Sequence, residues 1–350
     1  MHRHPSKPFR HVIITGGAGF IGSQISARLM KEKTRVTILT RNASAPRAAA
    51  LAKEGGKVVA CDFSDADRVP SPDTLDPADA LFHFAADVSV SSPTLRAANV
   101  DGTSRVLALA DALAIPYVVY ASSIEAQGLG SEPEIPLRED MACRPVSDYG
   151  QSKVLAEDLV TEWGSLSGHR ALVLRIGNIY GPGSAWFLHP SLLALLGATP
   201  IRTIWAKLRH RLFQPLFIDD LIEGLCRAVD RRLVGTYNIT GEEQVTIEGY
   251  LAKLASLAQL TDRVQLMHEP ATSLSRSHPI APDFAYVLMG SQERCHRAYD
   301  NSKLRAEIGP YARWPLSRGL AATLQWYDTS GRLPALLAAL RRQPGAMTCM

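Results

Sequence analysis

The chain has 350 residues, of which 46% are hydrophobic and 21% are charged, an ordinary composition for a water-soluble globular protein. The formal net charge of +4 is small for this length, which argues against a protein that binds nucleic acid. No stretch approaches the roughly 18 uninterrupted apolar residues of a membrane-spanning helix, and none resembles a hydrophobic signal region, so we expect a cytoplasmic protein that does not bind a membrane.

The first half of the chain alternates segments that are typical of strands with segments that are typical of helices. Short apolar runs predict strands at 11–15, 35–40, 57–60, 79–86, 117–123 and 171–177. Apolar residues at helical spacing predict helices at 20–32, 94–114 and 147–163. Strands that alternate with helices indicate a parallel sheet covered on both faces. The sequence therefore predicts an α/β protein with a Rossmann-type, doubly wound parallel sheet.

The pattern becomes less regular after residue 178. There the sequence predicts a turn-rich loop at 178–186, a strand followed by a helix at 215–232, and a further strand at 235–241. We expect a Rossmann domain at 10–177, to which 215–238 returns. The expected smaller C-terminal substrate-binding lobe comprises 178–214 and 239–340, and 341–350 is expected to be a mobile tail.

Cysteine and histidine residues show no pattern that is typical of a metal site. The five cysteines are far apart and form no Cys-x-x-Cys pair, which predicts free thiols in a reducing compartment. The ten histidines show no ligand spacing. We therefore expect that the protein binds no metal.

A cluster of glycines joins the first predicted strand to the first predicted helix. The stretch HVIITGGAGFIG, residues 11–22, contains both Gly17-x-Gly19-x-x-Gly22 and Gly16-x-x-Gly19-x-x-Gly22. Glycine permits the tight turn and a close approach of backbone to ligand, and the helix N-terminus then offers free N–H groups to a pyrophosphate. The position between strand and helix favours a dinucleotide site over an ordinary glycine-rich turn.

The end of the second strand bears on which dinucleotide is bound. An acidic residue usually stands here to hold the ribose hydroxyls, but this strand ends in Thr40, Arg41 and Asn42. Arg41 suits a ribose 2′-phosphate, which favours NADP, while a surface arginine beside an NAD site remains the alternative. Asp62, after the third strand, is a candidate for an adenine contact or a turn residue.

A tyrosine and a lysine four residues apart predict proton-transfer chemistry. Tyr149 and Lys153 share one face of the predicted helix. A phenol is a poor base at neutral pH, but a nearby ammonium and a positively charged nicotinamide ring would lower its pKa. Ser123, at the carboxyl end of a strand, could bond the same substrate oxygen. These three residues predict proton exchange with a hydroxyl while a hydride moves to or from the cofactor.

Taken together, these motifs resemble the extended short-chain dehydrogenase/reductase superfamily, and more narrowly its NAD(P)-dependent nucleotide-sugar epimerase/dehydratase family. Further similar stretches are LFHFAADVSV (81–90), NVDGT (99–103), LRIGNIYGPG (174–183), FIDDLIEGL (217–225) and NSKLRAEIG (301–309). The likeness covers most of residues 10 to 328. It implies an oxidoreductase or isomerase that forms a homodimer through the helices near 94–114 and 147–166.

The resemblance implies roles for individual residues. Ser123, Tyr149 and Lys153 would be the catalytic residues. The residues expected at the cofactor are Gly16, Gly19, Phe20, Ile21, Gly22, Arg41, Asp62, Phe63, Ala85, Ala86, Asn99, Tyr149 and Lys153. The residues expected at the substrate are Ser89, Glu125, Asn178, Arg202 and Arg211.

Two features depart from the family pattern. Glu125 stands near the position at which the 4,6-dehydratases have an acidic residue that acts as a base. The motif SSIE (122–125), however, is at least as similar to the 3β-hydroxysteroid dehydrogenase branch. Phe213 occupies about the position of an arginine that usually precedes the FIDD strand. Arg202 and Arg211 could instead clamp a substrate diphosphate, or belong to a solvated basic face.

Several functions are compatible with this sequence. The first is an NAD(P)-dependent epimerase or keto-reductase of a nucleotide-sugar, acting at a carbinol carbon. The alternatives are an oxidoreductase of a hydrophobic alcohol or ketone, similar to the 3β-hydroxysteroid dehydrogenases, and a sugar-nucleotide 4,6-dehydratase that uses Glu125. A catalytically silent dinucleotide sensor is a further alternative, against which the intact Ser123, Tyr149 and Lys153 argue.

Overall fold

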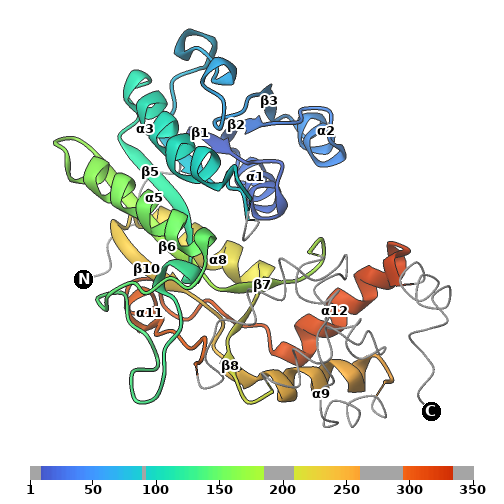
Figure 1. Ribbon diagram of the computed structural model, residues 1–350. Coiled ribbons are helices and arrows are strands. Elements are labelled where there is room, and N and C mark those ends of the chain that lie inside the picture. Colours follow the sequence, from blue (N-terminus) through green and yellow to red (C-terminus); the bar gives the residue numbers. More distant parts are fainter. Residues whose placement is uncertain (1–8, 89–91, 185–208, 261–294, 334–350) are drawn as a thin grey trace.

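The computed structural model describes residues 9–88, 92–184, 209–260 and 295–333. A seven-stranded sheet is central to this part of the chain (Figure 1). Its strands, in chain order, are β1 (His11–Thr15), β2 (Arg35–Thr40), β3 (Lys57–Ala60), β4 (Ala80–His83), β5 (Tyr117–Ser123), β6 (Arg170–Ile176) and β10 (Gly235–Ile239). In space their order is β10-β6-β5-β4-β1-β2-β3, and every pair is parallel. The predicted Rossmann-type, doubly wound α/β fold is confirmed.

Both faces of this sheet are apolar because its strands are buried on both sides. Val12 and Ile14 of β1 belong to one core and Ile13, between them, to the other, as the alternation of side chains along a strand requires. Helices α1 (Phe20–Lys31) and α8 (Ile218–Asp230) cover the first face, and α3 (Gly102–Ala112) and α5 (Asp148–Ser165) cover the second.

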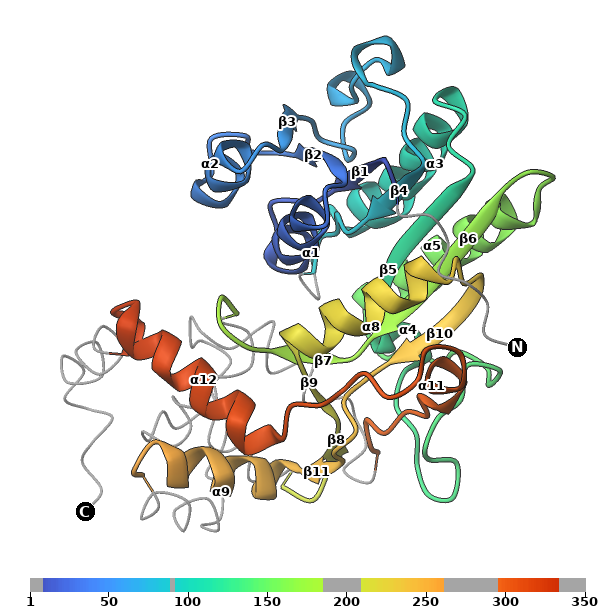
Figure 2. The ribbon, with the colours of Figure 1, turned by 180° about the vertical axis from the view of Figure 1, so that it is seen from behind.

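A second group of elements lies beside the carboxyl ends of the strands (Figures 1 and 2). Strand β7 (Asn178–Tyr180) pairs in parallel with β9 (Pro215–Phe217), and β8 (Leu212–Phe213) pairs antiparallel with β11 (Val245–Thr246). Helices α9 (Ile247–Leu257) and α12 (Leu316–Thr329) contribute Leu251, Leu254 and Leu320 to the core shared with α1 and α8. Helix α11 (Ser302–Ile308) lies against α8 and β10.

The structure departs from the predicted elements in several places. Strand β4 ends at His83, because beyond it the amide of Ala85 donates to the Thr15 side chain. The helix predicted at 94–114 begins as a π-helical turn, η3 (Ala97–Asp101), before α3. The predicted loop at 178–186 contains β7, because its backbone pairs with β9. Helix α2 (Pro46–Lys53) was not predicted, although its alanines favour a helix.

Short helical turns complete the described elements: η1 (Ala66–Arg68), η2 (Pro72–Thr74) and α4 (Ile124–Gln127).

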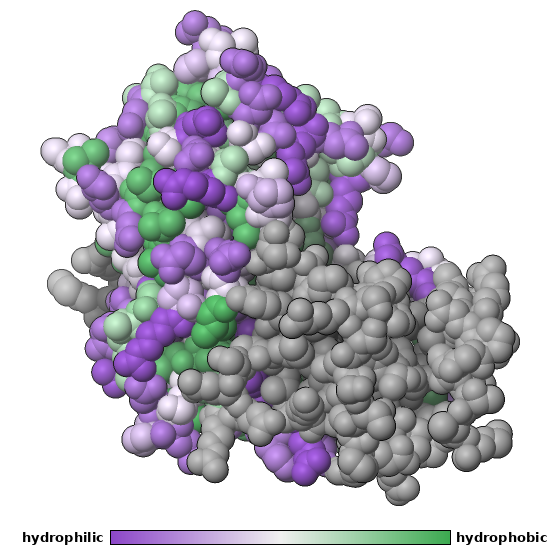
Figure 3. Space-filling model, in the orientation of Figure 1, coloured by the Kyte–Doolittle hydropathy of each residue, from purple (hydrophilic) through white to green (hydrophobic). Residues whose placement is uncertain are grey.

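The surface mixes polar and apolar residues. Hydrophilic residues, in purple, and hydrophobic residues, in green, are interspersed over the upper part of the face in Figure 3. Exposed apolar residues on and beside α5 include Val146, Leu155 and Leu166. Within the described ranges, no helix has the length and apolar character needed to cross a bilayer. The predicted tail at 341–350 lies outside the described residues.

Candidate active site

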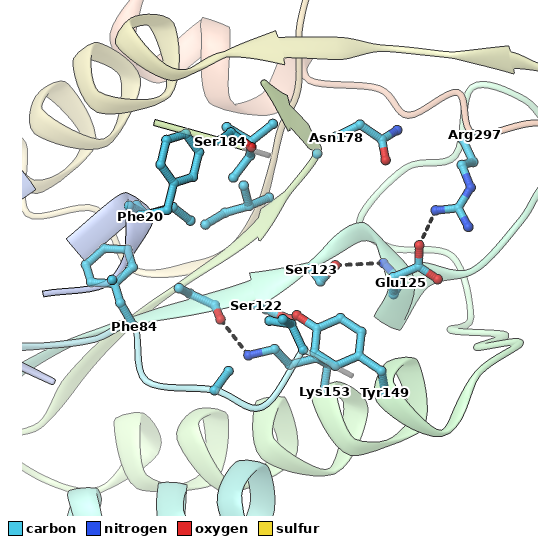
Figure 4. Close-up of a pocket in the computed structure, with 18 of the residues that line it drawn as sticks. Phe20, Phe84, Ser122, Ser123, Glu125, Tyr149, Lys153, Asn178, Ser184 and Arg297 are labelled. Carbon is cyan, nitrogen blue, oxygen red and sulfur yellow. Dashed lines mark hydrogen bonds and ion pairs between the residues drawn. The ribbon is translucent and has the colours of Figure 1, made fainter. Parts of the chain in front are cut away.

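A cavity of about 480 Å³ lies along the carboxyl edge of the sheet. Gly16, Gly19 and Gly22 line this cavity, and so do Ser123, Tyr149 and Lys153. Figure 4 shows Phe20 and Phe84 at one side of this cavity and Glu125 and Arg297 at the opposite side. The glycine turn, the predicted catalytic residues and part of the predicted substrate set therefore share one cavity. The cavity-lining residues from these predicted sets are Gly16, Gly19, Phe20, Ile21, Gly22, Ala86, Ser123, Glu125, Tyr149, Lys153, Asn178 and Arg211.

The glycine turn is built so closely that side chains are excluded. Gly16 has φ +65°, and a Cβ atom there would lie 2.6 Å from the amide nitrogen of Ala85. A Cβ atom on Gly22 would lie 2.2 Å from the carbonyl oxygen of Gly16. The turn thus presents backbone at the N-terminus of α1, where free N–H groups and the helix dipole favour an anion. These residues fit the pyrophosphate of a dinucleotide.

The catalytic candidates are placed by the ends of two elements. Ser123 ends β5, and its hydroxyl accepts a hydrogen bond of 3.2 Å from the amide of Glu125 at the start of α4. Ser147 caps α5, with its hydroxyl accepting a 2.9 Å bond from the amide of Gly150. Tyr149 thereby lies in the first turn of α5 and Lys153 one turn later. The Lys153 Nζ atom lies 5.8 Å from the centroid of the Tyr149 ring.

The environment changes the acidity of both groups. Burial and the negative charge of Glu125 raise the pKa of the Tyr149 phenol, while a hydrogen bond with Ser123 acts in the opposite direction. Burial lowers the pKa of Lys153 to about 7, although the charge of Glu157 favours the ammonium. In the protein alone, the phenol of Tyr149 is therefore protonated at neutral pH. A further positive charge in the cavity would be needed to make it a base.

A buried ion pair occupies the far side of the cavity. The carboxylate of Glu125 accepts from the guanidinium of Arg297, and both side chains line the cavity (Figure 4). Sequence reasoning missed Arg297, which is 172 residues from its partner. The only local signal is its position three residues before Asp300 and the NSK stretch of the family resemblance.

A short strand places an arginine and an aromatic residue together. Arg211 directly precedes β8 and Phe213 ends it; both are buried and both line the cavity. Residues two positions apart on an extended chain face the same side. Burial and the positive charge of Arg297 lower the pKa of Arg211 to about 10. Arg211 therefore brings a positive charge into the cavity beside Phe213.

Several predicted cofactor residues do not line the cavity. Arg41 is exposed after β2. The Asp62 carboxylate accepts from the amide and hydroxyl of Ser64. Burial opposes ionisation of Asp62, but the bonds from Ser64 and the charge of Arg41 lower its pKa. Phe63 is buried, and its carbonyl oxygen accepts from Arg105.

Asn99 and Ala85 support the cavity wall instead. The Asn99 side chain accepts from the amide of Asp87 at 2.8 Å. It donates to the Asp87 carbonyl oxygen and to the Ser152 hydroxyl, each at 2.9 Å. Asn99 therefore ties the segment after β4 to α5, and Ala85 in that segment packs on Gly16. Ser89 and Arg202 lie outside the described residues.

Other cavity residues were not among the predicted site residues. These are Phe84, Val88, Ala121, Ser122, Ile176, Gly177, Ile179, Ser184, Ile247 and Arg297, together with Phe213, which the sequence marked only as a departure from the family pattern. Phe84, Ser122 and Ile176 lie at or just beyond the carboxyl ends of β4, β5 and β6. Because ligands of doubly wound sheets bind at this edge, that position was the available signal. Among the described residues, no group of three or more His, Cys, Asp or Glu side chains could hold a metal ion.

Comparison with known proteins identifies the family. The sequence profile of the NAD dependent epimerase/dehydratase family matches residues 12–240. The chain belongs to this family. The predicted family, fold and enzyme class are confirmed.

Relatives within the family include epimerases and a dehydratase. UDP-arabinose 4-epimerase 1 of Arabidopsis thaliana is 33% identical over 184 residues, which are 49% of this chain and 43% of that protein. The match therefore spans less than half of the plant relative. dTDP-glucose 4,6-dehydratase of Streptomyces niveus is 26% identical over 343 residues, covering 90% of this chain and 92% of the relative.

The fold is also that of solved family structures. UDP-glucuronic acid 4-epimerase from Bacillus cereus, in complex with UDP-glucuronic acid and NAD, superimposes with a TM-score of 0.69 at 20% identity. The superposition covers 91% of this chain and 99% of that structure. At this identity the likeness concerns the fold.

Proposed function

We propose that the protein is an NAD(P)-dependent epimerase or keto-reductase of a nucleotide-sugar, with epimerisation as the favoured reaction. The observation that carries this proposal is that Ser123, Tyr149 and Lys153 line the cavity that begins at the glycine turn. Epimerases among the relatives support the reaction type. In this proposal, residues 10–177 and 215–238 hold the cofactor, and the rest of the described chain contributes the substrate side.

Each residue has a distinct role in the proposed reaction. When bound, the nicotinamide cofactor would supply a hydride acceptor and donor next to the carbinol carbon of the sugar. Tyr149 takes the hydroxyl proton at its phenol oxygen and later returns a proton there. The Ser123 hydroxyl bonds the same substrate oxygen. Lys153 stabilises the phenolate form of Tyr149 by its positive charge.

The Glu125–Arg297 pair supports epimerisation over elimination. A 4,6-dehydratase needs a carboxylate that can take a proton from a carbon atom. The Glu125 carboxylate instead accepts a hydrogen bond from the buried guanidinium of Arg297, so it is engaged by a cation rather than free to approach a substrate carbon. Its proposed role is therefore to shape the substrate end of the cavity together with Arg297, Arg211 and Asn178.

An apolar substrate is the second candidate. Phe20, Phe84, Phe213, Ile176 and Ile179 line the cavity, and such side chains suit a hydrophobic alcohol or ketone. This candidate predicts that no nucleotide-sugar changes the unfolding temperature of the protein, while an apolar alcohol is oxidised.

The identity of the dinucleotide depends on the surroundings of Arg41. NAD is the cofactor of the family and is present in the solved relative described above. Arg41 favours NADP by its charge, whereas the nearby carboxylate of Asp62 would repel a 2′-phosphate. We propose that these two residues together decide the choice between NAD and NADP.

The proposed assembly is a homodimer. The exposed Leu155 of α5 and Leu166, just after it, would be covered in a dimer formed through α3 and α5. Light scattering after size-exclusion chromatography measures this directly. A mass of one chain at micromolar concentration would contradict it.

The reaction itself is tested with isotope-labelled solvent. The protein is incubated in D2O with UDP-glucose, UDP-glucuronic acid or UDP-arabinose, and the sugar is examined by NMR. Hydride return to the same carbon gives an inverted sugar without deuterium at that carbon. Deuterium at that carbon, or no reaction with any nucleotide-sugar, would contradict the proposal. Acid extraction of freshly purified protein, followed by mass spectrometry, identifies any retained dinucleotide.

A further inference from the structure

Strand β5 provides two hydrogen-bond acceptors for the ammonium of Lys153, the candidate catalytic lysine. The Lys153 ammonium is buried and donates to the Tyr120 phenol oxygen at 3.0 Å and to the Ala121 carbonyl oxygen at 2.8 Å. An ammonium has three N–H donors. Two of them are directed to β5, and Lys153 lines the cavity, so the third is directed to the cavity side.

Tyr120 lies beside a buried chain of hydrogen bonds. Its phenol group interacts with the Thr103 side chain of α3. The Thr103 Oγ1 atom donates to the Asn99 carbonyl oxygen at 2.6 Å and lies 3.0 Å from Nε2 of His83. On the other side of the imidazole, Nδ1 lies 2.6 Å from the hydroxyl of Thr15.

The proton positions in this chain follow from its two ends. The Lys153 ammonium can only donate, so the Tyr120 hydroxyl accepts from it and its own proton points away from Lys153. The Asn99 carbonyl can only accept, so it takes the single proton of Thr103. Thr103 must then accept from His83, which places the His83 proton on Nε2.

The other end of the chain reaches the glycine turn. With its proton on Nε2, His83 accepts at Nδ1 from the Thr15 hydroxyl, whose oxygen accepts from the amide of Ala85 at 3.3 Å. Thr15 directly precedes Gly16, and Ala85 packs on Gly16. Thr15, His83, Thr103 and Tyr120 are each at most 1% exposed, so water does not replace any of these contacts.

We propose that Tyr120 is a positioning residue for Lys153, and that Thr103 and His83 hold its hydroxyl in the orientation that accepts from the ammonium. The chain thereby aims one N–H of Lys153 into the cavity and connects its position to the glycine turn. Only the catalytic consequence of this proposal depends on the proposed function, because that function assigns Lys153 its role in the reaction. The contacts themselves are independent of the substrate.

The charges around Lys153 determine what removal of Tyr120 does. Tyr149 and Glu157 face the ammonium from α5, Tyr120 from β5, and His83 from β4. Burial lowers the pKa of His83 to about 3, with a contribution from Lys153, so the imidazole remains neutral near pH 7. Glu157 is the negative group among these four. Loss of the phenol oxygen therefore removes an acceptor that favours the charged form of Lys153, and the pKa of Lys153 falls.

The test measures Lys153 directly. In protein labelled with [ε-13C]lysine, the Lys153 resonance is identified by its loss in Lys153→Met, and its titration midpoint is followed by NMR. In Tyr120→Phe we expect the midpoint to fall by about one pH unit, which is a tenfold change in proton affinity. Tyr117→Phe is the matched control, since Tyr117 is a buried phenol of the same strand that donates to the Leu233 carbonyl oxygen at 2.8 Å. An equal midpoint in wild type and Tyr120→Phe would overturn the proposal.

A second pair of variants tests the rest of the chain without altering Tyr120. Thr103→Val removes the hydroxyl that interacts with Tyr120, whereas Thr103→Ser keeps it. We expect a lower Lys153 midpoint in the valine variant and a nearly unchanged midpoint in the serine variant. Equal midpoints in the two would overturn the part assigned to Thr103, and this pair also decides the case if Tyr120→Phe does not fold. A shifted midpoint without turnover of any nucleotide-sugar would contradict the proposed function and leave this inference intact.

Discussion

Glu125 and Arg297 form a buried ion pair at one side of the cavity, although they are 172 residues apart in the chain. Glu125 belongs to the short helix after β5, and Arg297 to the segment before α11. The pair therefore joins the segment after β5 to the C-terminal part of the described chain.

Removal of one partner should destabilise the protein strongly. Arg297→Met leaves the Glu125 carboxylate buried without its guanidinium, and we expect the free energy of unfolding to fall by about 3–5 kcal/mol. Urea denaturation measures this change. The double variant Glu125→Gln/Arg297→Met should recover part of the loss. Arg138→Ala, which removes an exposed pair with Asp140, is the control and should change stability by less than about 1 kcal/mol. A similar small change in Arg297→Met would contradict the importance of the buried pair.

Tyr149→Phe should abolish turnover and leave cofactor binding nearly intact. The substitution removes the oxygen that exchanges a proton with the substrate, and we expect at least about a hundredfold loss in kcat. Isothermal titration with NAD and NADP measures binding in the same preparation. Wild-type activity in this variant would refute the assigned mechanism.

Arg41→Ala should separate the two dinucleotides. If Arg41 holds a 2′-phosphate, the variant loses about tenfold in affinity for NADPH and keeps its affinity for NADH, because only NADPH carries the extra charge. Arg35→Ala, at the opposite end of β2, is a control that leaves both affinities unchanged. Unchanged NADPH affinity in Arg41→Ala would show that Arg41 does not contact the 2′-phosphate.

His83 should make the protein sensitive to mild acid. Burial lowers the pKa of His83 from 6.5 to about 3, so between these values the unfolded chain binds a proton that the folded chain excludes. Stability is therefore lost as the pH falls through this range. Urea denaturation at pH 7 and pH 4.5 measures the slope. His83→Gln, whose side chain does not titrate, should give a shallower slope, and an equal slope would rule out His83 as the source.

Local spacing was sufficient to predict much of this enzyme. The glycines at 16–22 and the Tyr149–Lys153 pair lie within single turns or loops, where spacing along the chain determines position. Arg297 could not be assigned in the same way, because its partner is chosen by tertiary packing. Tyr120, His83 and Thr103 received no role from the sequence, because they stand on separate elements and only the folded structure brings their polar atoms together.

The order of the strands has a consequence for synthesis on the ribosome. Strand β10, residues 235–239, completes the sheet beside β6, but β6 ends at residue 176. Until the intervening chain has emerged, the nascent protein presents β6 as an open edge with unpaired backbone groups. Helix α8, which covers the adjoining apolar face, also appears late. Aggregation during translation, and demand for a chaperone, should therefore be greatest for nascent chains that have passed residue 176 and not yet released residue 239.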